Sequence, residues 1–417
     1  MGKYIVEGSK KLFGEVKIHG AKNSALPILA GALLCDNCIV ENCPELSDIH
    51  AAINILEYLG CETIWDTNSL IIKSTQIINS DIPENLMSEM RSSIVFLGAI
   101  VSKAKKARFS LPGGCELGPR PIDLHISSLE KMGVTFEEDH GYLNCFVKDK
   151  LHGAKISLPI PSVGATENII LAGCMAEGET VIYNAAREPE IGDLAGFLNT
   201  CGANITISDN GTVYIYGVNH LCGGSYKVMS DRIAAATYLC CGAAAGGEII
   251  VSHINPEYLL SVLPPLEEMG CQIKIYSDRI SLTADKKLKA VRNIRTMPYP
   301  GFPTDAQAPI MAVSTIADGS SMFVETIFQN RYKHAEQMQR MGADIKIDGR
   351  IAIVQGVKKL HSATVKCTDL RGGAAMVICA LAAEGISTIT EISHILRGYE
   401  SIEKNLQGLG ASIYLEN

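Results

Sequence analysis

The chain repeats one alternation of hydrophobic and polar positions six times. Each copy is a short helical segment that ends at a glycine, followed by a strand in which apolar and polar residues alternate. The copies read LEYLGCETIW, LEKMGVTFEE, LNTCGANITI, LEEMGCQIKI, MQRMGADIKI and LQGLGASIYL. Their glycines are spaced about 70 residues apart and are Gly60, Gly133, Gly202, Gly270, Gly342 and Gly410. A glycine in this position predicts a left-handed cap at the end of each helix.

A second kind of helix, rich in small residues, precedes each of these segments. It is apolar on nearly all sides, which predicts that it is buried. The six predicted helices span residues 25–34, 93–102, 167–176, 232–241, 308–317 and 374–383. The repeat is therefore a buried helix, a strand, an amphipathic helix, a glycine and one or two strands. Because a single repeat cannot bury its own faces, we expect six repeats to pack as two groups of three.

Composition narrows the class of protein. The chain has 417 residues, of which 47% are hydrophobic and 20% are charged, and this excludes a disordered chain or a coiled coil. Length alone allows two or three domains, and the repeats favour two. The formal net charge of −8 argues against nucleic-acid binding, which needs basic surface, but it allows a small anionic ligand held by a few cations.

The cysteines do not form a metal-binding pattern along the chain. Cys35, Cys38 and Cys43 lie close together in the sequence, but no second cluster completes a ligand set, so no zinc is expected. Cys240 and Cys241 lie in an apolar helical run and are expected in the core. No apolar run reaches the ~18 residues of a membrane span, and the start MGKYIVEGSK has no signal region. We expect a cytoplasmic protein with reduced thiols.

The segment LPGGCELGPRPIDLH, residues 111–125, is the most unusual stretch of the chain. Its glycines and prolines predict a loop, with Cys115 at its centre and Arg120 close behind. An exposed thiol beside an arginine can be reactive. On local sequence alone, a reactive cysteine and a loop cysteine without a role are equally good interpretations.

Several cations lie where repeats begin or end. Lys22, Arg91 and Arg371 stand at predicted helix starts, which attract anions. Arg331 and Arg397 lie in loop-like segments. Each of them alone is adequately explained as a solvated surface residue, but their recurrence predicts convergence on one cleft.

Asp305, in GFPTDAQAP, also stands where a predicted buried helix begins. Local sequence favours a helix cap at this position. The flanking glycine and prolines also allow an active-site loop, so both interpretations stay open.

Taken together, these motifs resemble the enolpyruvyl transferases. The resemblance is carried by KNSALPIL, LPGGCELGPRPIDLH, PSVGATENIILA, GFPTDAQAP, NRYKHAEQMQRMGA, DLRGGAA and HILRGYE, and it extends from Lys3 to Ile413. It implies an α/β fold of two inverse α/β barrel (prism) domains, each of three helix–strand repeats, with an active-site cleft between them. One domain would be 21–229, and the other would be 1–20 plus 230–417.

The PGGC and RPIDLH motifs resemble the branch of this family that uses UDP-N-acetylglucosamine. The implied reaction transfers the enolpyruvyl group of phosphoenolpyruvate to the sugar 3-hydroxyl, releases phosphate and passes through a tetrahedral ketal. It would be the first committed step of peptidoglycan precursor synthesis. The resemblance implies no metal, no organic cofactor, no nucleic acid, no membrane insertion and no obligatory protein partner.

The resemblance also implies roles for individual residues. Cys115 would be the general acid and the site of alkylation by fosfomycin, and Asp305 would be the base or orienter at the sugar hydroxyl. The substrate phosphate would be held by Lys22, Arg120 and Arg397. The carboxylate would be gripped by Arg331 and Arg371, because a guanidinium suits bidentate contact.

Asn23 would contact both substrates, Arg91 would lie beside the nucleotide sugar, and Asp369 would orient Arg371 through a side-chain pair. The remaining nucleotide-sugar contacts implied are Arg120, Pro121, Ile122, Asp123, Leu124, Ser162, Val163, Gly164, Asp305 and Ile327. Two alternatives to this function remain. One is a transferase that takes shikimate 3-phosphate as acceptor, against which the cysteine loop argues. The other is an inactive paralogue that binds the nucleotide sugar as a sensor.

Overall fold

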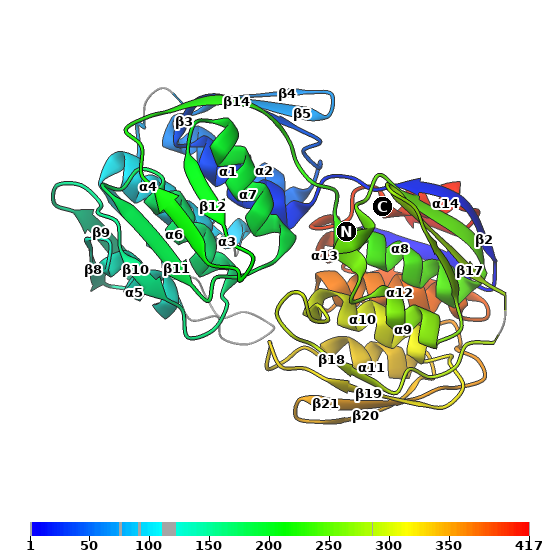
Figure 1. Cartoon of the computed structure of the whole chain (residues 1–417). Helices are drawn as coiled ribbons and strands as arrows, with labels where there is room; N and C mark the ends of the chain where they lie inside the picture. The colour runs from blue at the N-terminus through cyan, green and yellow to red at the C-terminus, as the bar shows by residue number, and fades with distance from the viewer. Residues whose placement is uncertain (1, 75–76, 91–92, 111–121, 286, 417) are drawn as a thin grey trace. The chain divides into compact units, whose positions relative to one another are not determined.

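The chain forms two compact units in a computed structural model that describes residues 2–74, 77–90, 93–110, 122–285 and 287–416 (Figure 1). Of these residues, the central unit holds those from Gly20 to Met229. The terminal unit holds those up to His19 and those from Ser230 onward. The chain therefore leaves the terminal unit after His19 and returns to it after Met229. The resemblance implies a first boundary one residue later, after residue 20, and the same second boundary, after residue 229.

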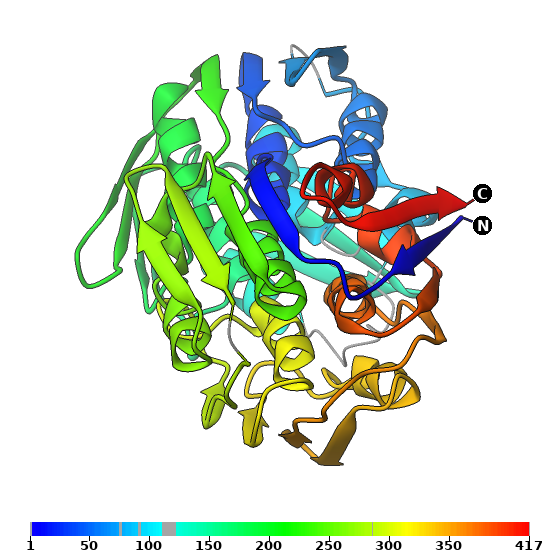
Figure 2. The same cartoon turned by 90° about the vertical axis from the view of Figure 1, so that its right-hand side faces the viewer.

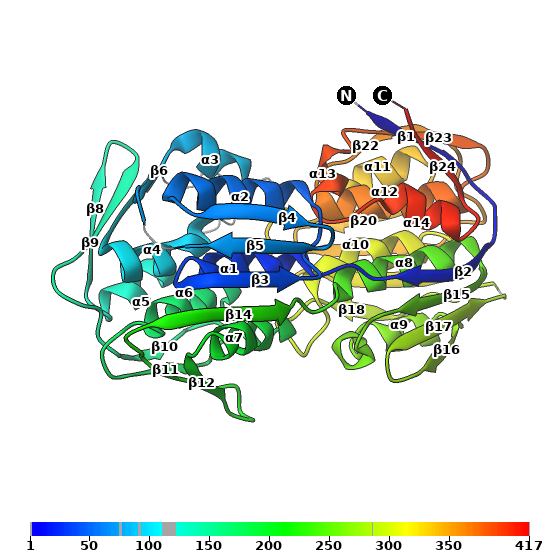
Figure 3. The same ribbon diagram turned by 90° about the horizontal axis from the view of Figure 1, so that it is seen from above.

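The described part of the central unit contains three four-stranded sheets. The first is ordered β14 (Leu221–Lys227), β3 (Cys35–Glu41), β5 (Ser69–Lys73) and β4 (Glu62–Asp66) (Figure 3). The second is ordered β6 (Asp81–Ile82), β7 (Lys106–Ser110), β9 (Tyr142–Val147) and β8 (Val134–Asp139). The third is ordered β10 (Lys155–Ser157), β11 (Glu179–Tyr183), β13 (Val213–Tyr216) and β12 (Asn204–Ile207).

Three buried helices pack together inside these sheets. They are α1 (Lys22–Ala32), α4 (Phe96–Ala104) and α6 (Val163–Gly173). Small residues allow their close approach, since a Cβ on Gly98 would lie 2.4 Å from the carbonyl oxygen of Asn168. The more exposed helices are α2 (Ser47–Leu59), α5 (Asp123–Glu130) and α7 (Pro189–Thr200), with the short α3 (Glu84–Glu89) and η1 (Ser93–Val95).

The described part of the terminal unit repeats this plan. Its first sheet is ordered β22 (Thr364–Lys366), β23 (Ile386–Thr390), β1 (Lys3–Glu7) and β24 (Ser412–Glu416). The second is ordered β16 (Gln272–Ile275), β17 (Arg279–Ala284), β15 (Gly247–Ser252) and β2 (Leu12–Lys17). The third is ordered β18 (Asn293–Arg295), β19 (Ser320–Val324), β21 (Ile351–Gln355) and β20 (Asp344–Asp348). The buried helices are α8 (Arg232–Ala245), α10 (Thr304–Ser314) and α12 (Leu370–Ala382). The outer ones are η2 (Pro256–Leu259), α9 (Leu263–Glu268), α11 (Lys333–Arg340), α13 (Ser393–Leu396) and α14 (Ile402–Gly408).

All six sheets have one topology, which confirms the predicted repeats. In each, an edge strand pairs in parallel with its neighbour, and the next two pairings are antiparallel. The chain ends follow the same rule, because β1 and β24 lie antiparallel with the termini side by side (Figure 2). The N-terminal strand thereby completes the repeat that the C-terminal segment begins.

The two units exchange one edge strand each. β2 precedes α1 in the chain, but it pairs in parallel with β15 of the terminal unit. β14 precedes α8, but it pairs in parallel with β3 of the central unit. Each unit thus closes its own ring of three repeats, although the six repeats run continuously along the chain.

The six repeat glycines adopt the predicted left-handed backbone. Their φ angles are 110° at Gly60, 97° at Gly133, 102° at Gly202, 101° at Gly270, 92° at Gly342 and 91° at Gly410. The inner helices predicted to be buried are buried, including Cys240 and Cys241 in α8. None of the helices in the described residues is long and apolar enough to cross a membrane.

Two glycines of the α7 region should respond in opposite ways to replacement by alanine, because Gly202 has a positive φ and Gly192 is helical. A Cβ added at Gly192 or at Gly202 would meet no atom within 4 Å, so packing does not decide either substitution. Gly202→Ala forces alanine into a positive-φ conformation and should lower the free energy of unfolding by about 1 kcal/mol. Gly192→Ala lies within α7 and should raise it by up to about 1 kcal/mol. Urea unfolding of both variants checks this, and equal effects of the same sign would contradict it.

Candidate active site

A carboxylate held by two buried arginines forms the core of the polar cluster in the terminal unit. Asp305 lies in the first turn of α10, whose N-cap residue is Pro303, so the helix-cap interpretation is wrong. Its Oδ1 accepts from Arg331 Nη2 at 2.9 Å, and its Oδ2 accepts from Arg371 Nε at 3.2 Å and Nη2 at 3.1 Å. Both arginines are 2% exposed. Two arginines from other segments of the chain therefore hold this carboxylate.

Asp369 acts on Arg371 differently from the expected side-chain pair. It is the N-cap of α12, and its Oδ1 accepts from the backbone N–H groups of Arg371 and Gly372 at 3.0 Å each. Its nearest charged partner is Arg331, whose Nη1 lies 4.0 Å away. Burial alone would raise the pKa of Asp369, but the charge of Arg331, the neighbouring His334 and the two backbone donors lower it overall.

The two guanidinium groups still have donors to offer. Arg331 Nε and Arg371 Nη1 are buried and have no hydrogen-bond partner among the described residues. Asp305 and Asp369 balance the two guanidinium charges, so the cluster offers these buried donors without a net charge. Such a site attracts a small anion, for which a guanidinium offers paired donors.

Arg397 and Ile327 lie in the same unit on separate segments. Arg397 is half-buried at the end of α13, and Ile327 is 39% exposed in the loop after β19. Glu325, which no local sequence pattern indicated, is 1% exposed. Its Oε1 accepts from the backbone N–H of Ile327 at 2.8 Å, and its Oε2 accepts from Thr304 Oγ1 at 2.9 Å. Glu325 therefore ties the Ile327 loop to the start of α10, next to Asp305.

In the central unit, Lys22 and Asn23 begin α1. Lys22 Nζ donates to Asp48 Oδ2 at 3.1 Å, and the side chains are 12% and 3% exposed, respectively. Asn23 is exposed. Asp48, which no local sequence pattern indicated, lies in the first turn of α2 and fixes the ammonium group at the start of α1.

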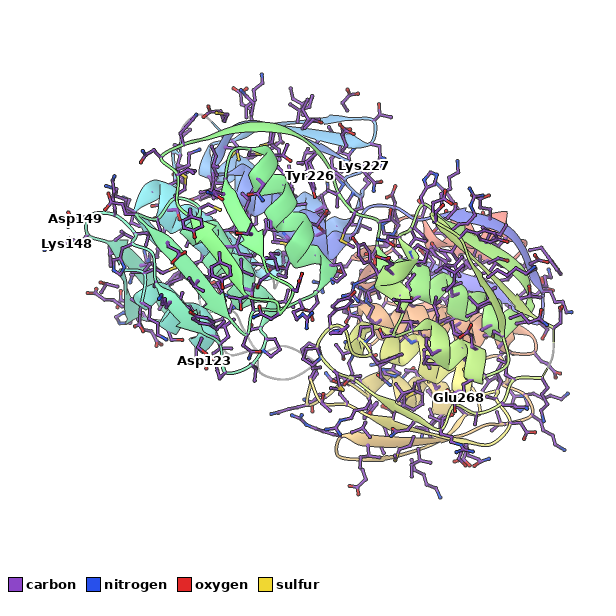
Figure 4. The ribbon with its side chains drawn as sticks, viewed as in Figure 1. Asp123, Lys148, Asp149, Tyr226, Lys227 and Glu268 are labelled. Carbon is purple, nitrogen blue, oxygen red and sulfur yellow. The ribbon has the colours of Figure 1, made fainter. Side chains whose placement is uncertain are left out.

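Asp193 anchors the same helix start from the other side. It accepts from the hydroxyls of Ser24 and Tyr226, the latter at 2.8 Å, and from the backbone N–H of Met229 at 3.0 Å. Tyr226 comes from β14, the exchanged edge strand (Figure 4). The start of α1 is thereby joined to α7 and to β14.

The predicted nucleotide-sugar residues of this unit lie at two other helix starts. Ile122 precedes α5, which begins with Asp123 and Leu124 (Figure 4). Ser162 is the N-cap of α6, where its Oγ accepts from Ala165 N at 3.4 Å, and Val163 and Gly164 begin that helix. These residues are exposed or half-buried. The free N–H groups at the start of α6 favour an anion there.

Asn168 joins the helices that carry these segments, and the sequence analysis missed it. Its Nδ2 donates to the carbonyl of Ile94 at 3.0 Å and contacts His125 Nδ1 at 2.9 Å, and its Oδ1 accepts from Gly98 N at 2.6 Å. It also donates to Gly164 O at 3.4 Å. An amide in the apolar run of residues 167–176 was the available signal, because a buried amide must find partners.

Arg91, Cys115, Arg120 and Pro121 lie outside the described residues. Of the other predicted residues, the structure brings Asp305, Arg331, Arg371 and Asp369 into one cluster. Lys22 and Asn23 share one helix start, and the nucleotide-sugar set occupies two more. Every one of these groups is at or next to the beginning of a helix.

The fold is that of solved enolpyruvyl transferases, which confirms the expected fold class. A sequence profile confirms the expected family. The chain belongs to the EPSP synthase (3-phosphoshikimate 1-carboxyvinyltransferase) family, whose sequence profile matches residues 6–406. The structure is similar to the enolpyruvyl transferase NikO from Streptomyces tendae, with a TM-score of 0.90, 22% identity and coverage of 99% and 98% of the two chains. It is also similar to EPSP synthase from Acinetobacter baumannii, with a TM-score of 0.76, 17% identity and full coverage of both chains.

Curated relatives are more similar in sequence. UDP-N-acetylglucosamine 1-carboxyvinyltransferase 2 of Caldanaerobacter subterraneus subsp. tengcongensis is 49% identical over 99% of both chains. The protein of the same name from Clostridium tetani is 45% identical over 99% of this chain and all of that one. UDP-N-acetylglucosamine 1-carboxyvinyltransferase 1 of the former organism is also 45% identical, over 99% of both chains.

Two buried histidines predict a loss of stability in acid. Burial lowers the pKa of His125 and of His334 from 6.5 to about 4. Between these values the unfolded chain binds more protons than the folded one, so stability is full above pH 6.5 and falls as pH drops toward 4. Each histidine contributes up to about 3 kcal/mol to this loss.

Unfolding measured from pH 7 to 4 checks this. His125→Gln should flatten the profile, while His140→Gln, at a side chain 93% exposed, should leave it as in the unsubstituted protein. A profile unchanged by His125→Gln would contradict the assignment.

Proposed function

We propose that this protein transfers the enolpyruvyl group of phosphoenolpyruvate to the 3-hydroxyl of UDP-N-acetylglucosamine and releases inorganic phosphate. The observation that carries the proposal is the 49% identity, over 99% of both chains, to a protein named UDP-N-acetylglucosamine 1-carboxyvinyltransferase 2. We further propose that both domains, 21–229 and 1–20 plus 230–417, contribute residues to the active site, as in the family that the sequence resembles.

The reaction is an addition followed by an elimination. The sugar 3-hydroxyl oxygen attacks C2 of the enol while a base takes its proton and an acid delivers a proton to C3. The resulting ketal then loses a proton from C3 and expels phosphate, which restores the double bond. Asp305 serves as the base or orienter of the hydroxyl, and its partial exposure of 28% leaves it accessible to a ligand.

The buried arginines support the proposed binding of phosphoenolpyruvate. Arg331 and Arg371 hold the carboxylate of phosphoenolpyruvate through their unpaired N–H groups. The phosphate is held by Lys22, Arg120 and Arg397. Lys22 contributes a charge fixed by Asp48. Asp369 keeps the start of α12, and so the backbone of Arg371, in place.

The nucleotide sugar occupies the helix starts of the central unit. Val163 and Gly164 offer N–H groups at the start of α6 to the diphosphate, with Ser162 as the cap. The remaining contacts proposed are Asn23, Arg91, Arg120, Pro121, Ile122, Asp123, Leu124 and, from the terminal unit, Asp305 and Ile327. Cys115 is the general acid and the position that fosfomycin alkylates.

A phosphate-release assay with both substrates tests the reaction. Asp305→Asn should lower kcat by a factor of roughly 10²–10⁴, the range for loss of a positioned acid or base. Cys115→Ser should lower it similarly and should abolish a fosfomycin adduct in intact-mass analysis. Thermal unfolding verifies that each variant is folded. Phosphate release by the unsubstituted protein no faster than by Cys115→Ser would refute the proposal.

The acceptor is decided in the same assay. Phosphate release with shikimate 3-phosphate in place of UDP-N-acetylglucosamine would instead favour the second acceptor. Calorimetric binding of the nucleotide sugar without any turnover would favour an inactive paralogue.

Asn168 is expected to position the nucleotide-sugar segments. Asn168→Ala leaves the N–H of Gly98 and the carbonyl of Ile94 without their partner, which costs about 2–4 kcal/mol of stability. It should raise KM for UDP-N-acetylglucosamine about tenfold, which corresponds to about 1.4 kcal/mol of lost binding. It should change KM for phosphoenolpyruvate less than twofold.

Asn199→Ala is the matched control in the same unit. Asn199 makes two hydrogen bonds, donating to Ile205 O at 2.8 Å and accepting from Ile205 N at 2.9 Å. Its loss should reduce stability without changing either KM. If Asn168→Ala and Asn199→Ala change stability alone, Asn168 has no positioning role.

A further inference from the structure

Three cysteine thiols converge inside the central unit, at a place that the proposed reaction does not use. Cys35 and Cys38 lie in β3, and Cys201 is the C-cap of α7. Their three Sγ atoms all lie within 4.8 Å of one another, and the residues are 0%, 1% and 2% exposed. Among the described residues this is the one group of three or more histidine, cysteine or acidic side chains with a spacing that fits a metal ion.

The backbone fixes all three positions. Cys35 and Cys38 pair with Leu221 and Gly224 of β14 in a parallel ladder. Cys201 closes α7 through bonds from its N–H to Phe197 O at 3.1 Å and Leu198 O at 3.0 Å. Its own carbonyl accepts from Cys222 N, also in β14, at 3.0 Å. The thiols are therefore preorganised by secondary structure and do not depend on a mobile loop.

The spacing suits one ion bound by three sulfurs. Metal–thiolate bonds of about 2.3 Å around a single centre place the sulfurs roughly 4 Å apart. The observed separations need a movement of less than about 1 Å to reach that geometry. Structural zinc takes four ligands, and the group contains only three such side chains in the described part of the chain. Soft, three-coordinate Cu(I) matches both the donor atoms and their number.

The charge around the cluster favours an ion of low charge. Lys103 lies within electrostatic range of Cys35 and Cys38, and its Nζ donates to Leu33 O at 2.7 Å and Ser74 O at 2.8 Å. Cu(I) with two thiolates and one thiol would carry one net negative charge, which the Lys103 ammonium group balances.

We propose that Cys35, Cys38 and Cys201 form a binding site for one Cu(I) ion. Binding forms three Cu–S bonds, releases two thiol protons to solvent, keeps the third thiol as a neutral ligand and changes no oxidation state. The ion then ties β3 to the end of α7. This also revises the expectation from the sequence, which saw Cys35 and Cys38 but no partner for them.

An anaerobic titration of the full chain with Cu(I), in competition with a chromogenic Cu(I) chelator, tests the site. The unsubstituted protein should bind one tight equivalent, and X-ray absorption at the copper edge should give three sulfur neighbours at about 2.3 Å. Cys201→Ser should weaken this equivalent at least 100-fold. Cys145→Ser, at a cysteine of the same unit that is also buried, and Cys222→Ser, at an exposed one, should not weaken it.

Two results would overturn the proposal. One is an unchanged Cu(I) affinity in Cys201→Ser, and the other is a copper centre with two sulfur neighbours in the unsubstituted protein. Should Cys201→Ser fail to fold, the absorption spectrum of the unsubstituted protein decides alone. A tight zinc equivalent with four ligands, bound in preference to Cu(I), would also overturn the choice of ion. None of these measurements depends on enolpyruvyl transfer.

Discussion

Six small-residue helices that must be buried on every side are the constraint from which the rest of this structure follows. In each unit, three of them pack together, and a ring of three sheets encloses them. Close approach requires small residues, as at Gly98 against Asn168 O. The ring is closed by an edge strand supplied from elsewhere in the chain, by β14 in one unit and by β2 in the other.

This constraint also explains where the polar chemistry lies. An apolar helix that is buried along its length accepts polar side chains chiefly at its ends, where four N–H groups lack partners. Lys22, Ser162, Asp305 and Arg371 all stand at such starts, and Asp231 caps α8 in the same way, with two bonds of 2.8 Å. Aligned backbone dipoles make these ends favourable for anions. A chain of net charge −8 can therefore offer strong local sites for anionic substrates.

Some of the candidate site was predictable from sequence, because helix starts carry local signals. Lys22, Asp305 and Arg371 follow turn-forming residues and precede apolar runs. Their supporting residues were not predictable in this way. Asp48, Glu325 and Asn168 act through partners on other elements, and nothing in their own neighbourhoods names those partners. Local reasoning also misjudged Asp305 as a helix cap, because two distant arginines offer it stronger, charged partners.

The sequence by itself determined the repeat, the buried helices and the left-handed glycines, since each depends on residues within one or two turns of one another. Tertiary structure decided which strand completes which sheet. It also decided that Cys201 meets Cys35 and Cys38, and that Asp305 lies between Arg331 and Arg371. These pairings join segments far apart in the chain. Their energy comes from burial and from satisfying polar groups inside each closed ring, and neither is encoded at any one position.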